Sequence, residues 1–371
     1  MKIGITGQGG FIGYHISQTI KYKFENDTLV SFQRSFFEDN RALNSFVSSC
    51  DVIIHLAGVN RAETDEEVYD SNIQINTFFK EALLHVNFNG HLIFASSAQE
   101  DANTLYGKAK KESRIFLEQT IKELGGKFTG LIIPNVFGPF CKPNYNSFIA
   151  TFCSKILNSE ATKIIQDSNV PLIYVGNLVN QILGHIYQDK EVKQTYLTPD
   201  IEIRVSDVLT LLKDFKHSYI DNNTIPVLSN SFEFQLFNTF RSYIDLENSY
   251  PITLKKHSDE RGFFSEIIRT EIGGQFSYST TLPGITRGNH FHTRKIERFI
   301  LLQGKAKISL RKIGSDKVYD YLLDGDQPSY VDMPVWYTHN ITNTGKDPLL
   351  TSFWINEPYN SEDADTYFEN V

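Results

Sequence analysis

KIGITGQGGFIG, at residues 2–13, sets the architecture of the first half of this 371-residue chain. Its first four residues predict a short buried strand, and the isoleucines that recur after the glycines predict a helix. Between them, Gly7 permits a tight turn, Gly10 lets the backbone approach a pyrophosphate, and Gly13 allows close helix packing. Strand, glycine turn and helix in this order favour dinucleotide binding by Thr6, Gly7, Gly10, Phe11, Ile12 and Gly13.

The end of the second predicted strand, residues 29–32, indicates which dinucleotide is bound. Gln33 and Arg34 follow this strand, about 20 residues after Gly13, where an NAD site usually places an acid for the ribose hydroxyl. A guanidinium at that position suits a 2′-phosphate, which favours NADPH over NADH. The alternative is that Arg34 is a solvated loop residue.

Two further apolar runs predict parallel strands whose carboxyl ends lie at the ligand-binding edge of the sheet. DVIIHLAG, at 51–58, closes with small residues that allow a cofactor ring to lie against the backbone of Leu56, Ala57 and Gly58. His55 within this run is expected to be structural. The next run, residues 92–95, delivers Ser96 and Ser97.

Tyr106 and Lys110 lie four residues apart and therefore share one face of a predicted helix. A nearby ammonium would lower the phenol pKa from its ordinary value of roughly 10. The phenol would then exchange a proton with a sugar oxygen while a nicotinamide exchanges hydride with the adjoining carbon. This spacing alone is common on solvated helices, and the glycine turn and the serine pair give it weight.

Composition limits the remaining possibilities. With 371 residues, of which 40% are hydrophobic and 13% aromatic, the chain suits two globular domains. A net charge of −8 argues against general nucleic-acid binding. Three cysteines without a CxxC pair indicate reduced residues, and no apolar run predicts a membrane span or a leader after Met1. We therefore expect a cytoplasmic protein with no nucleic-acid or membrane partner.

Residues 1 to about 245 resemble the extended short-chain dehydrogenases/reductases that act on nucleotide sugars. The resemblance implies a doubly wound, parallel Rossmann-type α/β sheet, with Tyr106 as acid, Lys110 as its pKa modifier and ribose ligand, and Ser97 polarising the carbonyl. Ser96 is the alternative to Ser97, and Asn72 matches the family's helix asparagine. Gly176 and Asn177 depart from the family, which usually has acidic residues there. The motifs that carry the resemblance are TGQGGFIG (6–13), DVIIHLAG (51–58), FASSA (94–98), YGKAK (106–110) and PNVFGP (134–139).

A second domain begins where helical patterning gives way to short alternating strands with Gly, Pro and Asn turns. We expect a reductase domain at 1–247 and an all-β domain at 248–371. Two histidines two apart on a strand point to the same side. With a glutamate and a third histidine on neighbouring strands they predict a site for a first-row divalent metal. The four predicted ligands are His290, His292, Glu297 and His339.

The spacing of these ligands resembles that of the cupin (jelly-roll) barrel, with Trp336 at a position where glycine is usual. The domain also resembles sugar-nucleotide 3,5-epimerases through DERGFFSE (259–266) and RGNHF (287–291). In those epimerases the histidine that matches His290 acts as a base and binds no metal. Because His290 is here a predicted metal ligand, the role of base does not transfer to it directly. Zn²⁺ is the expected metal, because an epimerisation needs no redox change at the metal and because imidazole and carboxylate ligands suit zinc.

A reductase fused to an epimerase-like cupin resembles the bifunctional enzymes of capsular polysaccharide biosynthesis. The resemblance implies a UDP-linked 2-acetamido-2,6-dideoxy-4-hexulose, epimerised at C3 and then reduced at C4 with NADPH to the L-talose derivative. It also implies a homodimer. A C3 proton is acidic only while C4 is a ketone, so the cupin must act before the reductase.

Besides such a bifunctional enzyme, two alternatives stay open from the sequence. In the first, the chain is an epimerase or dehydratase that retains and recycles its NAD. In the second, the cupin is a sugar-binding or dimerising module attached to a reductase. The metal is either a Lewis acid for the enolate or a structural ion, and a four-ligand cage favours the structural role.

Overall fold

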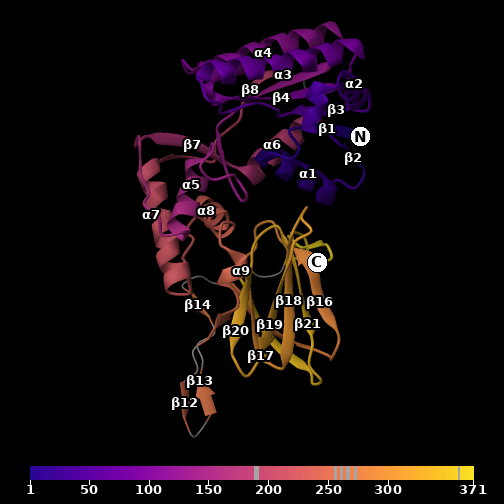
Figure 1. The fold of residues 1–371 in the computed structure, drawn as a ribbon. Helices are drawn as coiled ribbons and strands as arrows, with labels where there is room; N and C mark the ends of the chain where they lie inside the picture. The colour runs from indigo at the N-terminus through magenta and orange to yellow at the C-terminus, as the bar shows by residue number, and fades with distance from the viewer. Residues whose placement is uncertain (188–191, 255–256, 260–261, 265–267, 271–273, 358–359) are drawn as a thin grey trace. The chain divides into compact units, whose positions relative to one another are not determined.

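The computed structural model describes residues 1–187, 192–254, 257–259, 262–264, 268–270, 274–357 and 360–371 (Figure 1). They form two compact units. The first comprises Met1–Thr151 and Ile164–Asp207, and the second comprises Phe152–Lys163 and Val208–Val371. In the DERGFFSE motif, Glu260, Arg261, Ser265 and Glu266 lie outside the described residues.

Within the described part of the first unit, six parallel strands form a sheet in the order β2-β1-β3-β4-β5-β8. The order reverses between β1 and β3, which is the switch point where open α/β sheets bind ligands. The strands are β1 (Lys2–Thr6), β2 (Thr28–Val30), β3 (Val52–His55), β4 (His91–Ser97), β5 (Lys127–Ile133) and β8 (Val192–Tyr196).

Helices cover both faces of this sheet (Figure 1). A core cluster joins α2, α3 and α4 to the strands through Phe46, Phe79 and Leu117, which are at most 3% exposed. Helix α1 follows β1 and packs with α6. The helices are α1 (Phe11–Lys23), α2 (Asn40–Ser48), α3 (Asp65–His85), α4 (Leu105–Glu123) and α6 (Val175–Tyr187), with short helices η1 (Arg34–Glu38) and η2 (Ala98–Asp101).

The glycine turn between β1 and α1 requires its glycines. Gly7 has φ +74°, in the left-handed region that favours glycine. A Cβ on Gly13 would lie 2.3 Å from the Gly7 carbonyl oxygen. Gly10 donates its N–H to the same oxygen at 2.9 Å. The sequence KIGITGQGGFIG therefore folds as the predicted strand, turn and helix.

A smaller sheet lies beside the main one in the first unit. In it, β6 (Asn135–Phe137) runs parallel to β7 (Asn169–Tyr174), which pairs antiparallel with β9 (Ile201–Arg204). At the start of α6, Asp200 accepts from the Tyr174 N–H at 2.6 Å and from Asn177 Nδ2 at 2.9 Å. An acid from the loop before β9 thus stabilises the segment in which Gly176 and Asn177 replace the usual acids.

The second unit combines helices with a barrel of strands. Tyr219 donates its hydroxyl to Asp332, and Arg241 donates to the Met333 carbonyl at 3.0 Å, so the helices pack against β20. Its helices are the π-helix η3 (Lys216–Asp221), α8 (Ser231–Arg241) and α9 (Leu246–Ser249). The helices α5 (Phe148–Leu157) and α7 (Val205–Phe215) are divided between the units, most of α7 lying in the second.

Two antiparallel five-stranded sheets of described residues form the barrel, in the orders β11-β20-β17-β22-β15 and β19-β18-β21-β16-β23. Their inner faces meet, as the 5.7 Å between the Phe299 and His339 rings shows. The strands are β11 (Ile252–Thr253), β15 (Gln275–Thr281), β16 (Thr286–Phe291), β17 (Glu297–Gln303), β18 (Lys305–Lys312), β19 (Val318–Asp324), β20 (Ser329–Met333), β21 (Tyr337–Asn343), β22 (Leu349–Ile355) and β23 (Tyr367–Phe368).

Short strands pair at the margin of the second unit: β10 (Thr224–Ile225) with β14 (Arg269–Thr270), and β12 (His257–Asp259) with β13 (Gly262–Phe264). The predicted class, a doubly wound parallel sheet followed by an all-β cupin-type barrel, is confirmed. The expected domain boundary after residue 247 falls within α9, shortly before β11 begins, while the compact units divide near Asp207. None of the described helices is long and apolar enough to cross a membrane.

Candidate active site and metal centre

Thr6 joins the ends of β1 and β3 at the switch point. Its side-chain oxygen accepts the N–H groups of Leu56 at 3.1 Å and Ala57 at 3.2 Å. A Cβ on Gly7 would lie 3.3 Å from the Ala57 nitrogen, so the two loops are in close contact. The structure therefore brings together two of the predicted cofactor-binding segments.

His55 continues this contact into the core through a hydrogen-bond chain whose direction can be assigned. Because Thr6 Oγ1 already accepts two N–H groups, its hydroxyl donates to His55 Nδ1, 2.7 Å away. Nε2–H then donates to Asn76 Oδ1 at 3.0 Å, and Asn76 Nδ2 donates to the Asn72 carbonyl at 2.7 Å. Burial, followed by the Lys110 cation, lowers the pKa of His55 to about 3, so the ring is neutral. This geometry supports a structural role for His55.

Asn72, Gly58 and Lys110 meet beside this chain. The Asn72 side chain donates to the Val59 carbonyl at 2.6 Å and accepts the Val59 N–H at 3.1 Å. A Cβ on Gly58 would lie 2.9 Å from Asn72 Oδ1 and 4.0 Å from Lys110 Nζ. Glycine at position 58 thus leaves the Asn72 amide and the Lys110 ammonium facing the backbone after β3.

The two serines that end β4 have different environments. Ser96 is buried and donates its hydroxyl to Glu100, whose carboxylate also accepts two bonds from Arg114 Nε, the shorter of 2.9 Å. Ser97 is partly exposed and caps η2, where its oxygen accepts the Gln99 N–H at 3.2 Å. Because the Ser96 hydroxyl is committed to Glu100, the geometry favours Ser97 for substrate.

Tyr106 lies in the first turn of α4, which Thr104 caps by accepting the Gly107 N–H at 3.1 Å. Gly107 is required there, since a Cβ would lie 1.9 Å from the Gln99 carbonyl oxygen. Burial and the nearby Tyr145 raise the pKa of Tyr106 to about 12. The lowering expected from Lys110 is therefore wrong in direction: burial raises the phenol pKa, and Lys110 Nζ lies over the Phe94 ring, 4.5 Å from its centroid.

Lys110 is buried, and its own pKa is lowered to about 8 because burial disfavours the ammonium, although Glu100 partly offsets this. A phenol that is protonated at neutral pH and a lysine close to deprotonation occupy the face predicted for them. Such a phenol is in the correct state to donate a proton.

Arg34 begins η1, four positions after Val30 ends β2, and is exposed. Its guanidinium forms no hydrogen bond or ion pair with any residue that the structure describes. Phe11 and Ile12 begin α1 directly after the glycine turn and are half-buried. The geometry leaves Arg34 available to an anion but does not distinguish this role from that of a solvated residue.

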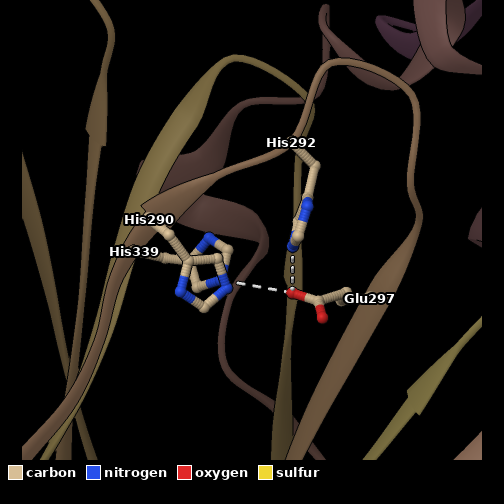
Figure 2. Close-up of side chains that lie close together, drawn as sticks. All are labelled: His290, His292, Glu297 and His339. Atoms are coloured by element: carbon tan, nitrogen blue, oxygen red, sulfur yellow. Dashed lines mark ion pairs between the residues drawn. The ribbon is translucent and has the colours of Figure 1, made fainter. Parts of the chain in front are cut away.

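The four predicted metal ligands converge in the barrel (Figure 2). His290 lies on β16 directly opposite His339 on β21, and Glu297 begins β17 in the facing sheet. Glu297 Oε2 lies 3.1 Å from His292 Nε2 and 3.2 Å from His339 Nε2. One ligand atom from each of the four residues lies within 4.8 Å of the others.

The charges in this cluster fit a cation. Burial alone would raise the pKa of Glu297, but His292 and His339 hold it well below its usual range. Burial, with the neighbouring His339 and His292, lowers the pKa of His290 to about 4. Glu297 Oε2 and the Nε2 atoms of His292 and His339 are buried and lack a hydrogen-bond partner among the described residues. Three unsatisfied buried donor or acceptor atoms facing one point are what a tetrahedral N/O metal site requires.

Local backbone geometry directs these imidazoles inward. A bulge between Gly288 and His290 re-aims the end of β16, with Asn289 at φ +58°. Trp336, where the cupin resemblance predicts glycine, has φ +62° and donates its N–H to the His292 carbonyl at 2.8 Å. The unusual backbone conformation is thus kept despite the bulky side chain.

Several residues around these sites gave no signal in the sequence. Asn76 and Arg114 read as ordinary helix residues, and Glu100 and Asp365 as ordinary loop acids. Their roles depend on partners brought near by folding, such as His55, 21 positions from Asn76, and His292, 73 positions from Asp365. Only their burial, which a single sequence does not reveal, would have identified them.

The comparisons with known families match both halves of the chain. Residues 3–196 match the NAD dependent epimerase/dehydratase family, and residues 257–367 match the polysaccharide biosynthesis C-terminal domain. A Bacillus subtilis protein, spore coat polysaccharide biosynthesis protein SpsL, is 28% identical over 30% of this chain and 81% of its own.

Two relatives match over the full length. The UDP-2-acetamido-2,6-beta-L-arabino-hexul-4-ose reductase of Pseudomonas aeruginosa is 32% identical, covering 99% of this chain and 98% of its own. A crystal structure of the capsular polysaccharide assembling protein CapF from Staphylococcus aureus is 34% identical, covers 100% of both chains and has a TM-score of 0.62. The chain therefore belongs to the NAD-dependent epimerase/dehydratase family and is a full-length relative of CapF.

Proposed function

We propose that the chain is a bifunctional nucleotide-sugar enzyme of capsular polysaccharide biosynthesis. The observation that carries this proposal is the full-length likeness to a named 4-hexulose reductase, 32% identical over 99% of the chain. The substrate is then a UDP-linked 2-acetamido-2,6-dideoxy-4-hexulose. The barrel epimerises C3, and the parallel-sheet unit reduces the C4 ketone to the L-talose derivative.

In the reduction, NADPH supplies the hydride when bound. Tyr106 donates its phenolic proton to the C4 oxygen, and the Ser97 hydroxyl donates a hydrogen bond to that oxygen. Lys110 binds the cofactor ribose. Support comes from the protonated state of Tyr106, whose pKa is raised to about 12, and from the commitment of Ser96 to Glu100.

The cofactor is bound by Thr6, Gly7, Gly10, Phe11, Ile12, Gly13, Arg34, Leu56, Ala57, Gly58, Asn72 and Lys110. Arg34 pairs with the 2′-phosphate and gives the preference for NADPH. Changing Arg34→Asp should raise the Kd for NADPH at least tenfold and leave that for NADH within about twofold, because a repelling charge replaces the phosphate's partner. Isothermal titration of both cofactors measures this ratio, and an unchanged ratio would exclude the role of Arg34.

The barrel holds Zn²⁺, or another first-row divalent metal, through His290, His292, Glu297 and His339. The orphaned buried atoms and the N/O donor set support this assignment. A cage of three imidazoles and one carboxylate leaves little room for substrate, so we assign the metal a structural or positioning role.

The two steps have a fixed order. Removal of the C3 proton gives an enolate only while C4 is a ketone, and reduction ends that activation. The barrel therefore acts first, and the parallel-sheet unit makes the change irreversible by consuming NADPH.

The test follows purified protein with the UDP-linked 4-hexulose by NMR in D₂O. We expect deuterium at C3 without cofactor, and one NADPH oxidised per sugar reduced. Turnover without net NADPH oxidation would instead indicate an epimerase or dehydratase that retains NAD. Reduction without deuterium at C3 would make the barrel a binding or dimerising module.

We also propose a homodimer, as the resemblance implies. Sedimentation equilibrium at micromolar concentration should give twice the mass of the chain, and a monomer would contradict the proposal.

A further inference from the structure

Residues 360–371, which we call the C-terminal clasp, contact the segments that carry three of the four metal ligands. Within the clasp, β23 pairs with β16, placing Phe368 opposite His290. The Glu369 carbonyl accepts the hydroxyl of Thr338, the neighbour of His339. The clasp therefore joins strands β16 and β21 close to the proposed ligands.

Asp365 binds the loop between His292 and Glu297 through its buried carboxylate. Its Oδ1 accepts the Thr293 N–H at 3.1 Å and the Thr293 hydroxyl at 2.6 Å. Its Oδ2 accepts the N–H groups of Arg294 at 3.0 Å and Lys295 at 3.1 Å. Three successive backbone N–H groups and one hydroxyl thus depend on a single carboxylate that is 4% exposed.

The backbone carbonyl of Asp365 fixes the tautomer of His292. A carbonyl oxygen can only accept, so the His292 Nδ1 that it contacts must carry a proton. The lone pair available for a metal is then on Nε2, which lies 3.1 Å from Glu297 Oε2. At its other end, the His292 carbonyl is held by the Trp336 N–H at 2.8 Å.

From these contacts we infer that Asp365 is a positioning residue for the metal centre. Its backbone carbonyl orients the His292 ring, and its carboxylate fixes the loop between His292 and Glu297. This inference rests on the proposed metal centre. Metal-ligating imidazoles are oriented by hydrogen bonds to residues that do not themselves touch the metal. Loss of such a bond typically weakens metal binding about 10–100-fold. Asp365 itself has φ +40°, in the region that Asp tolerates better than most residues.

Three variants of the full-length protein separate the carboxylate from the backbone conformation. Asp365→Gly removes the carboxylate and accepts a positive φ without strain. Asp365→Ala removes the carboxylate and adds strain, and Asp365→Asn keeps one acceptor oxygen. Glu362→Ala is the control, since this exposed side chain in the same segment has no partner among the described residues.

The readouts are zinc affinity, by competition with a chromogenic chelator, and the visible absorption spectrum of the Co²⁺-loaded protein, which reports ligand geometry. We expect zinc affinity to fall about 10–100-fold in Asp365→Gly and Asp365→Ala, and less in Asp365→Asn. The Co²⁺ bands should shift in all three variants, and Glu362→Ala should match the wild type. Near-ultraviolet circular dichroism checks folding, and Asp365→Asn provides the test if the other two unfold.

Wild-type zinc affinity and an unchanged Co²⁺ spectrum in Asp365→Gly would overturn the inference. Failure of the wild type itself to retain zinc or Co²⁺ on dialysis would overturn the metal centre as well. The two failures are therefore distinguishable.

Discussion

Tyr106 illustrates how burial sets the protonation state of a proposed catalytic group. A phenol whose pKa is raised to about 12 keeps its proton throughout the neutral range, as reduction of a ketone requires. The same burial would oppose the reverse oxidation, which needs the phenolate. The residue environment therefore holds Tyr106 in the protonation state that donates to a ketone.

Changing Tyr106→Phe should lower NADPH oxidation about 10²–10⁴-fold, because the proton donor is lost, and leave the Kd for NADPH within about twofold. Stopped-flow absorbance and cofactor titration measure the two effects. Tyr69→Phe is the control, since its half-buried hydroxyl donates to Glu112 and has no role in the proposed reaction. Near-normal turnover in Tyr106→Phe would exclude the assignment.

The two serines provide a second contrast. Ser97→Ala should reduce turnover with little effect on stability. Ser96→Ala should destabilise the protein by about 1–3 kcal/mol, because the buried Glu100 carboxylate loses a donor. Urea unfolding and steady-state kinetics on both variants give the comparison, and the opposite pattern would assign the carbonyl contact to Ser96.

Lys110 should make kcat/KM for NADPH depend on pH. Its pKa is lowered to about 8, so the ammonium is present below this value and is lost as pH rises through it. We expect kcat/KM to fall up to tenfold per unit above about pH 8. Lys110→Arg, which stays charged, should be less active but independent of pH over this range. A wild-type profile that stays level to pH 10 would contradict this role.

At the level of elements, the barrel brings together one carboxylate and three imidazoles whose buried lone pairs need a cation. Glu297→Gln should weaken zinc binding by more than the roughly 10–100-fold expected for the Asp365 variants, because Glu297 is a proposed ligand of the metal itself. It should also lower the thermal stability of the zinc-loaded protein. Metal analysis and calorimetry with and without zinc test this. Glu247→Gln, on an exposed pair with Lys317, is the control, and equal zinc content in both variants would remove Glu297 from the site.

The elements also show what the sequence can predict. The glycine turn, the strand ends and the four metal ligands are local patterns. The structure brings the four ligands together, but His292 lies just past the end of β16 and Glu297 lies on β17 in the facing sheet, not on a neighbouring strand. The Tyr106 pKa was mispredicted because its environment comes from burial and from Tyr145, 39 positions away in the sequence. The hydrogen-bond partners of Asp365 and Glu100 were not predicted, because contacts between buried polar groups produce no repeating pattern in the sequence.

At the level of the whole molecule, the proposed activities lie in different units and should be separable in the intact chain. Tyr106→Phe should keep deuterium exchange at C3, and Glu297→Gln should keep reduction of a ketone that already has the right C3 configuration. NMR in D₂O with and without NADPH tests both variants. Loss of C3 exchange in Tyr106→Phe would place epimerisation in the first unit.

A chain that ends at Asp245 tests the boundary differently. The proposed cofactor residues are all in the first unit, so NADPH binding should be retained. The remaining part of the second unit loses its barrel partners, including Asp332 for Tyr219 and the Met333 carbonyl for Arg241. We therefore expect an additional transition at lower temperature in calorimetry. A single transition at the wild-type temperature would show that residues 208–245 fold without the barrel.

The bond between His292 and Asp365 spans 73 positions, and this has a consequence for biosynthesis. A ribosome makes the chain from its amino end, and the parallel sheet has all its strands once Tyr196 has emerged. The metal ligands emerge later, and the residue that orients His292 later still. During translation, nascent chains thus pass through a stage in which the parallel sheet is complete while the proposed zinc ligands are not yet positioned, so zinc should be acquired only after Asp365 has emerged.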